Sequence, residues 1–227
     1  MTQLLISVTS VAEAKIALEN GADIIDLKDP SSGALGALPL SQIQAVVDYV
    51  HSEKPEKVLT SATIGDLPMQ ADVILQHVTQ LASTKVDIIK IGFFSSDDYQ
   101  PCLDTLSNLT QKGLKLIAVL FAEMTYPTGL IEAIKQAGFV GVMLDTSQKN
   151  GLTLLDYYSE DQRRYFSKQV LALEMSLGVA GSLRLQHINL VMEMRPSYMG
   201  FRGGVCVENE RASGLVASKI RAIRATL

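Results

Sequence analysis

The chain has 227 residues, of which 47% are hydrophobic and 19% are charged, and its formal net charge is −4. This length fits one large α/β domain, residues 1–227, better than two small domains. The chain has no basic run that could neutralise a phosphate backbone, which argues against nucleic-acid binding. The N-terminal residues lack the basic and long apolar regions of a signal peptide, so we do not expect one, and no stretch has the roughly 18 apolar residues that span a membrane. We therefore expect a cytoplasmic protein that does not associate with membranes.

Strand and helix patterns alternate along the whole chain. Short apolar runs predict buried strands at 4–8, 24–28, 57–64, 86–91, 114–121, 140–145, 177–181 and 198–202. Apolar residues at helical spacing, several followed by glycine, predict helices at 11–20, 39–51, 71–83, 101–112, 130–137, 159–175, 183–194 and 212–226. Eight strand–helix units in one chain indicate a TIM (β/α)8 barrel. No Gly-x-Gly-x-x-Gly follows the first strand, so a dinucleotide-binding fold has no support.

The carboxyl ends of the strands of such a barrel meet at one mouth, where the fold places its chemistry. In strand order, the residues expected there are Asp26 and Lys28, then Ser61, Thr63 and Asp66, then Lys90, Glu123, Asp145 and Lys149, and finally Gly181, Ser182, Arg202, Gly203 and Gly204. Side chains two residues apart on a strand point the same way. Asp26 and Lys28 are therefore predicted to share one face.

The strand lysines are candidates for covalent or acid–base chemistry. Lys90 stands between two isoleucines, which predicts a buried, inward-pointing amine. Burial and a second nearby cation both favour the neutral amine, which can form a Schiff base or accept a proton. Asp26 and Asp145 oppose that effect, so the residues alone do not decide which lysine attacks. The alternative interpretation is that each lysine makes a structural salt bridge at the rim.

Two loops that contain glycine predict a phosphate site. Gly181 and Ser182 follow the seventh strand, and Gly203 and Gly204 follow the eighth, directly after Arg202. Loops at these positions of a TIM barrel commonly bind phosphate through main-chain N–H groups. Alternatively, the glycines only end their strands. For Asp66 and Glu123 the sequence favours a structural role.

The remaining candidate ligands give no metal site. Cys102 and Cys206 lie far apart and are expected to be free thiols in a reducing compartment. His51, His77 and His187 fall in predicted helices, away from the strand ends. We predict neither a metal nor a cofactor.

Eight segments in order carry a resemblance to a known family. They are residues 21–30 (GADIIDLKDP), 33–37 (GALGA), 61–66 (SATIGD), 88–92 (IIKIG), 145–146 (DT), 149–151 (KNG), 180–183 (AGSL) and 202–206 (RGGVC). Together they resemble the (5-formylfuran-3-yl)methyl phosphate synthases of methanofuran biosynthesis, from near residue 4 to the end of the chain. Residues 121–129 fit the family least well, which leaves the role of Glu123 open.

The resemblance implies a TIM-barrel lyase that needs no metal. Such an enzyme condenses two molecules of glyceraldehyde 3-phosphate into a furan aldehyde phosphate, with loss of phosphate and water. The position of Lys28 matches the Schiff-base lysine of the family, and Lys90 matches its proton acceptor. Asp26, Asp145 and Lys149 match further active-site positions.

Two other functions use the same residues. One is a class I aldolase that acts on another sugar phosphate, and the other is a phosphate-ligand sensor that has lost the chemistry. In every case the expected partner is a small phosphorylated molecule. The apolar segment 215–227 fits a homo-oligomer contact and ordinary core packing equally well.

Overall fold

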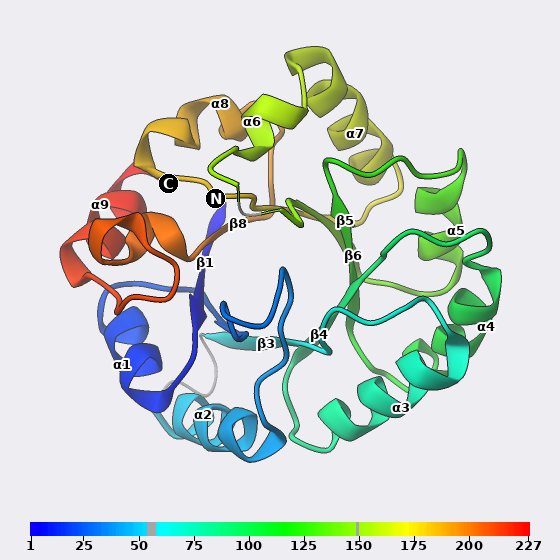
Figure 1. Ribbon diagram of the computed structural model, residues 1–227, viewed down its shortest axis with the longest axis horizontal. Helices are drawn as coiled ribbons and strands as arrows, with labels where there is room; N and C mark the ends of the chain where they lie inside the picture. The colour runs from blue at the N-terminus through cyan, green and yellow to red at the C-terminus, as the bar shows by residue number, and fades with distance from the viewer. Residues whose placement is uncertain (54–57, 149) are drawn as a thin grey trace.

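The computed structural model describes residues 1–53, 58–148 and 150–227, and these residues contain a closed barrel of parallel strands (Figure 1). The strands are β1 Gln3–Val8, β2 Ile24–Leu27, β3 Leu59–Thr63, β4 Ile88–Gly92, β5 Leu116–Phe121, β6 Gly141–Asp145, β7 Ser176–Val179 and β8 Tyr198–Phe201. Each strand pairs with the next along the chain, and β8 pairs with β1 to close the barrel. The prediction of a TIM barrel is confirmed.

Helices surround the barrel, as Figure 1 shows. They are α1 Val11–Glu19, α2 Leu40–Glu53, α3 Ala71–Ala82, α4 Gln100–Thr110, α5 Leu130–Gln136, α6 Leu154–Tyr157, α7 Glu160–Ala172, α8 Ile188–Met192 and α9 Ala217–Thr226. Short 3-10 turns form at η1 Leu185–His187, η2 Gly203–Val205 and η3 Val207–Asn209. In the described part of the chain, no helix has the length and apolar character needed to cross a bilayer.

The structure differs from the predicted elements mainly after β6. Helix α6 was not predicted because its four residues are too few to show a periodicity; it is fixed by a capping box between Thr153 and Asp156. The predicted helix 183–194 is divided into η1 and α8. The predicted helix 212–226 begins only at Ala217, because residues 203–216 form a loop closed by a bridge between Cys206 and Leu215. The first residue of the predicted strand 57–64 lies outside the described residues.

The strands are buried on both faces, as their continuous apolar runs predicted. One apolar cluster lies between the barrel and the helices. A second cluster centres on the barrel interior and includes Leu5, Ile24, Ile88, Ile117, Val119, Phe121, Met143, Ala180 and Tyr198. The polar residues Asp26 and Lys90 are buried at the carboxyl ends of the strands, above this interior layer.

The connection between β2 and α2 folds back over the centre of the barrel (Figure 1). Its Leu35 is fully buried and packs with the interior cluster. Asp66 holds the turn in place by accepting hydrogen bonds from the main-chain N–H groups of Ala34 and Leu35, at 2.8 and 2.7 Å. Gly36 is required there because a Cβ would lie 2.5 Å from the carbonyl oxygen of Asp29. This connection therefore closes part of the mouth.

A glycine inside the barrel gives a test of this packing. Gly178 on β7 faces Tyr198 on β8, and a Cβ at Gly178 would lie 2.3 Å from the tyrosine ring. We expect Gly178→Ala to lower the free energy of unfolding by about 1–3 kcal/mol, since the ring has to move within a packed interior. Urea unfolding measures this change.

Gly214→Ala is the matched control. A Cβ at Gly214 meets no atom within 4 Å. We expect its free energy of unfolding to stay within about 0.5 kcal/mol of the parent chain. Equal stability of the two variants would contradict the packing of Tyr198 over Gly178.

Candidate active site

A cavity of about 270 Å³ opens at the carboxyl ends of the strands. Its lining combines predicted site residues from β2, β6, β7 and β8, which confirms that these strand ends meet. The lining includes Asp26, Lys28, Asp145, Gly181, Ser182, Arg202, Gly203, Gly204 and Arg211. The cavity is thus polar on all of these sides and lies beside the buried polar residues of the barrel.

The carboxylate of Asp26 is fully buried and has partners on three other strands. Ser7 of β1 donates to its Oδ2 at 2.9 Å, and Ser61 of β3 donates to its Oδ1 at 2.6 Å. Lys90 Nζ of β4 lies 2.6 Å from the same Oδ1. Burial alone would raise the pKa of Asp26, but the charges of Lys90 and Lys28, with the hydrogen bonds from Lys90 and Ser61, hold it below the ordinary value. The carboxylate is therefore ionised in the folded protein.

The two lysines beside this carboxylate differ in their access to the cavity. Lys28 follows the last residue of β2, is 7% exposed, and lines the cavity. The Lys90 side chain is 2% exposed and lies against Asp26. A molecule in the cavity therefore meets Lys28, with Lys90 buried against the carboxylate.

Of the remaining predicted polar residues, Asp145 reaches the cavity and two others hold loops. Asp145 is 3% exposed and accepts a hydrogen bond from the N–H of Thr146 at 2.7 Å. Glu123 binds the β6–α6 connection by accepting from Ser147 Oγ and the N–H of Gln148. Asp66 holds the β2–α2 connection, as described above. The predicted site residue Lys149 lies outside the described residues.

The two glycine loops meet at the cavity, as their predicted phosphate role requires. A Cβ at Gly204 would lie 2.4 Å from the carbonyl oxygen of Leu183, so the loop after β8 packs directly against the loop after β7. Gly181 has φ = +104° and Ser182 has φ = +54°, which turns the chain sharply after β7. Among the described residues, no acceptor takes the main-chain N–H of Ser182, Gly203 or Gly204. These N–H groups form a cradle suited to an anion.

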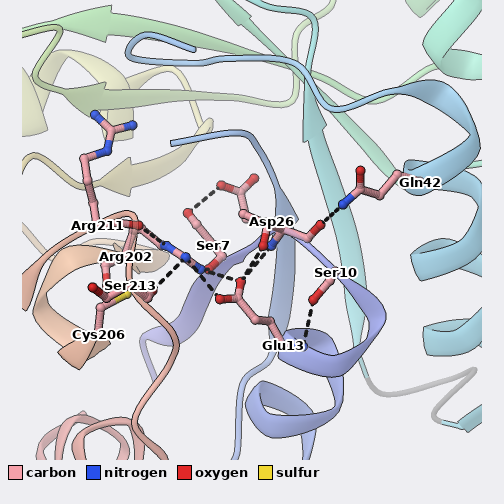
Figure 2. A network of polar contacts seen from close by, with 10 residues as sticks. Ser7, Ser10, Glu13, Asp26, Gln42, Arg202, Cys206, Arg211 and Ser213 are labelled. Carbon is pink, nitrogen blue, oxygen red and sulfur yellow. Dashed lines mark hydrogen bonds and ion pairs between the residues drawn. The ribbon is translucent and has the colours of Figure 1, made fainter. Parts of the chain in front are cut away.

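Arg202 does not fit the direct phosphate role that we predicted. Its five N–H groups all donate within the protein: two bind Glu13, at 2.5 and 3.1 Å, and three bind the carbonyl oxygens of Ser7, Arg211 and Ser213. Figure 2 shows this network. The guanidinium is neutralised by Glu13 and has no donor left for a phosphate. Arg202 instead fixes the loop after β8 to β1 and α1.

A second arginine, which the sequence did not single out, enters the cavity. Arg211 lies in the 203–216 loop and is half-buried, and its Nη2 donates to the carbonyl oxygen of Gly33 at 2.9 Å. Figure 2 shows its side chain pointing away from Arg202. Arg211 follows the loop residues Glu208 and Asn209, which have positive φ angles of 53° and 61°. No local sequence pattern predicts where such a loop directs its side chains.

No group of three or more His, Cys, Asp or Glu side chains in the described ranges has an arrangement that could hold a metal ion. Both cysteines are free and buried. His51 lies 3.2 Å from Asp87, and His77 and His187 contact their own helical turns. These histidines lie outside the cavity lining, as predicted.

A family comparison covers almost the whole chain. The model of the 4-HFC-P synthase family matches residues 4–224. The chain belongs to the 4-HFC-P synthase family.

Two relatives of known name agree with this family assignment. A protein of Methylorubrum extorquens named as a putative (5-formylfuran-3-yl)methyl phosphate synthase is 37% identical, over 98% of this chain and 92% of the relative. The (5-formylfuran-3-yl)methyl phosphate synthase of Methanococcus maripaludis is 32% identical, over 94% of this chain and 93% of the relative.

Solved structures of other proteins have the same barrel fold as this chain. Phosphoribosyl anthranilate isomerase from Thermus thermophilus has a TM-score of 0.68 and 15% identity, and the match covers 99% of this chain and 97% of that one. The 3-keto-L-gulonate-6-phosphate decarboxylase of Vibrio cholerae has a TM-score of 0.67 and 11% identity, over 99% and 96% of the two chains. At such low identity these likenesses show the fold alone.

The buried ion pair predicts a pH-dependent loss of stability in the Asp26→Asn variant. At pH 7 we expect its free energy of unfolding to be about 3–5 kcal/mol lower than that of the parent chain, because Lys90 loses the carboxylate that it contacts. The folded pKa of Asp26 is depressed, so its contribution is present above the ordinary value of 3.8 and is lost as the pH falls through the folded pKa. The difference in free energy of unfolding between the parent chain and Asp26→Asn should therefore become smaller as the pH falls over that range. Urea unfolding at a series of pH values measures it.

Asp48→Asn on the exposed face of α2 serves as the control. Its free energy of unfolding should stay within about 0.5 kcal/mol of the parent value at every pH. A destabilisation by Asp26→Asn that does not change with pH would contradict the ion pair.

Proposed function

We propose that this chain condenses two molecules of glyceraldehyde 3-phosphate into (5-formylfuran-3-yl)methyl phosphate, with loss of phosphate and water. The proposal is supported by the family of the chain and by one geometric feature. That feature is the amine of Lys28 in the wall of a polar cavity, beside a buried carboxylate that also binds Lys90. Reaction through a Schiff base requires such an accessible amine with proton-transfer groups nearby.

In the first step, neutral Lys28 attacks the carbonyl carbon of one triose phosphate. The carbonyl oxygen leaves as water, and the resulting iminium draws electrons from the adjacent carbon. This loss of water consumes one proton, which the ammonium of Lys90 supplies through its contact with Asp26. The positive charge thus passes from Lys90 to the iminium on Lys28, and the neutral amine of Lys90 then accepts a proton from the substrate carbon by way of Asp26, which lines the cavity.

Loss of that proton gives an enamine, which attacks the aldehyde carbon of the second triose phosphate and forms the new carbon–carbon bond. Ring closure and elimination of phosphate and water then require several proton transfers. Asp145 and Asp26 both line the cavity, which supports their part in these transfers, and Lys149 is assigned to the same steps by the family resemblance. The N–H groups of Gly181, Ser182, Gly203 and Gly204 bind the phosphate that the product retains.

The central test is Lys28→Arg, which keeps a positive charge beside Asp26 but removes the usable nucleophile. We expect the rate of furan formation from glyceraldehyde 3-phosphate to fall by several orders of magnitude, about the loss seen when a covalent nucleophile is removed. Near-ultraviolet absorbance of the furan aldehyde measures the rate, and mass spectrometry identifies the product. Lys112→Arg, an exposed lysine at the opposite end of the barrel, should leave the rate unchanged.

Borohydride trapping with glyceraldehyde 3-phosphate separates the alternatives. The proposal requires a reduced adduct on the peptide that contains Lys28, and this adduct should be absent in Lys28→Arg. An adduct on Lys90 would reverse the two roles. An open-chain sugar phosphate product would indicate a class I aldolase, and binding without any adduct would indicate a ligand sensor.

A further inference from the structure

Arg211 spans the mouth of the cavity from the β8 side to the β2 side. Its Cβ is 3.9 Å from the position of a Cβ on Gly203, so the base of its side chain lies beside the glycine cradle. Its Nη2 lies 2.9 Å from the carbonyl oxygen of Gly33, on the connection between β2 and α2. The guanidinium is therefore well separated along the side chain from the cradle, and it lines the same cavity as Lys28.

The guanidinium is a cation whose donors are mostly unused within the protein. Among the described residues its single hydrogen-bond acceptor is the carbonyl oxygen of Gly33, and no described carboxylate forms an ion pair with it. Burial lowers the pKa of Arg211, Asp145 opposes this effect, and the charge of Arg202 adds to it. An arginine nevertheless stays protonated near neutral pH. A half-buried charge without a contacting carboxylate is costly unless the cavity supplies an anion.

The position of this cation is fixed by the network in Figure 2. Arg202 Nε donates to the carbonyl oxygen of Arg211 at 2.8 Å, and Arg202 Nη2 donates to that of Ser213 at 3.1 Å. Lys219 Nζ binds Cys206 O and Asn209 Oδ1 of the same loop, at 2.7 and 2.9 Å. The loop therefore presents Arg211 from a fixed backbone, as an anion-binding residue requires.

We propose that Arg211 binds the phosphate of the second triose phosphate, on the β2 side of the mouth, and that the glycine cradle binds the phosphate of the first. This proposal rests on the proposed function. Each phosphate carries about −1.5 to −2 charges near neutral pH, so the reaction brings two strongly negative groups into one cavity. The cradle offers neutral N–H groups to one of them. Arg211 offers the other a planar fork that matches phosphate oxygens.

Titration with inorganic phosphate tests the proposal, with calorimetry as the readout. The parent chain is first reduced with borohydride in the presence of glyceraldehyde 3-phosphate, so that Lys28 carries a covalent adduct whose phosphate fills the cradle. We expect this adduct protein to bind one further phosphate. In Arg211→Gln the adduct should still form, and the further phosphate should bind roughly 10- to 100-fold more weakly, as expected for lost hydrogen bonds to a charged group.

Two further variants complete the comparison. Arg211→Lys keeps the charge without the fork and should give an intermediate affinity. Arg164→Gln removes an exposed arginine of α7 that pairs with Glu160, and should bind phosphate as the parent adduct does. Circular dichroism shows whether Arg211→Gln is folded. If it is not folded, the phosphate affinity of the Arg211→Lys adduct, compared with that of the parent adduct, decides whether Arg211 binds the further phosphate.

The outcomes distinguish this proposal from the proposed function. An adduct protein that binds no further phosphate, or equal phosphate affinity in the parent and Arg211→Gln adducts, overturns the role of Arg211. Absence of any adduct in the parent chain counts against the chemistry of Lys28 alone. In that case the unmodified proteins decide: two phosphates per parent chain and one per Arg211→Gln chain support the second site, and equal numbers overturn it.

Discussion

The carboxylate of Asp26 is the group on which the geometry of the mouth depends. It is fully buried, so its charge is tolerated only because Ser7, Ser61 and Lys90 bind it from three other strands. The register pairs Asp26 with Ser7 on one side and with Ser61 on the other. A slip of any of these strands by one residue would turn its side chain outward and remove one partner of the buried charge. The contacts of Asp26 therefore fix the strand register, and the same contacts hold the lysine amines close to this carboxylate.

A second constraint, the Arg202–Glu13 pair, determines the shape of the mouth. Glu13 stands in the first turn of α1 and also accepts hydrogen bonds from the N–H and hydroxyl of Thr9. Arg202 links Glu13 to the loop after β8, because it also donates hydrogen bonds to the carbonyl oxygens of Arg211 and Ser213. Because Arg202 is buried and all of its N–H groups are bonded, the loop after β8 has one favoured position relative to β1. The two constraints are complementary: Asp26 organises the reactive amines, and Arg202 organises the loop that faces them.

The strand ends show most clearly which parts of the site can be predicted from the sequence. Alternation along a strand, together with a closed barrel, is enough to bring Asp26, Lys28, Lys90 and Asp145 to one end, and the structure places them there. The roles of Arg202 and Arg211 depend instead on contacts between residues 189 positions apart and on a loop with positive φ angles. A single sequence carries no local signal for either. The phosphate role predicted for Arg202 does not match its contacts for that reason, since Glu13 on α1 pairs with its charge.

The connection between β2 and α2 makes the two lysines unequal. Leu35 of this connection packs into the barrel interior, and Asp66 holds the turn that places it there. A Cβ at Gly92, two residues after Lys90 on the same face of β4, would lie 2.8 Å from Leu35, so the connection covers β4 beside Lys90. Lys90 contacts Asp26 there, and Lys28 lines the cavity. In the proposed reaction a carbonyl group can reach only the second of these amines without movement of the connection. The asymmetry needed for one lysine to attack and the other to accept a proton therefore rests on burial, because Lys90 is held against Asp26 away from the cavity lining and Lys28 lies in that lining.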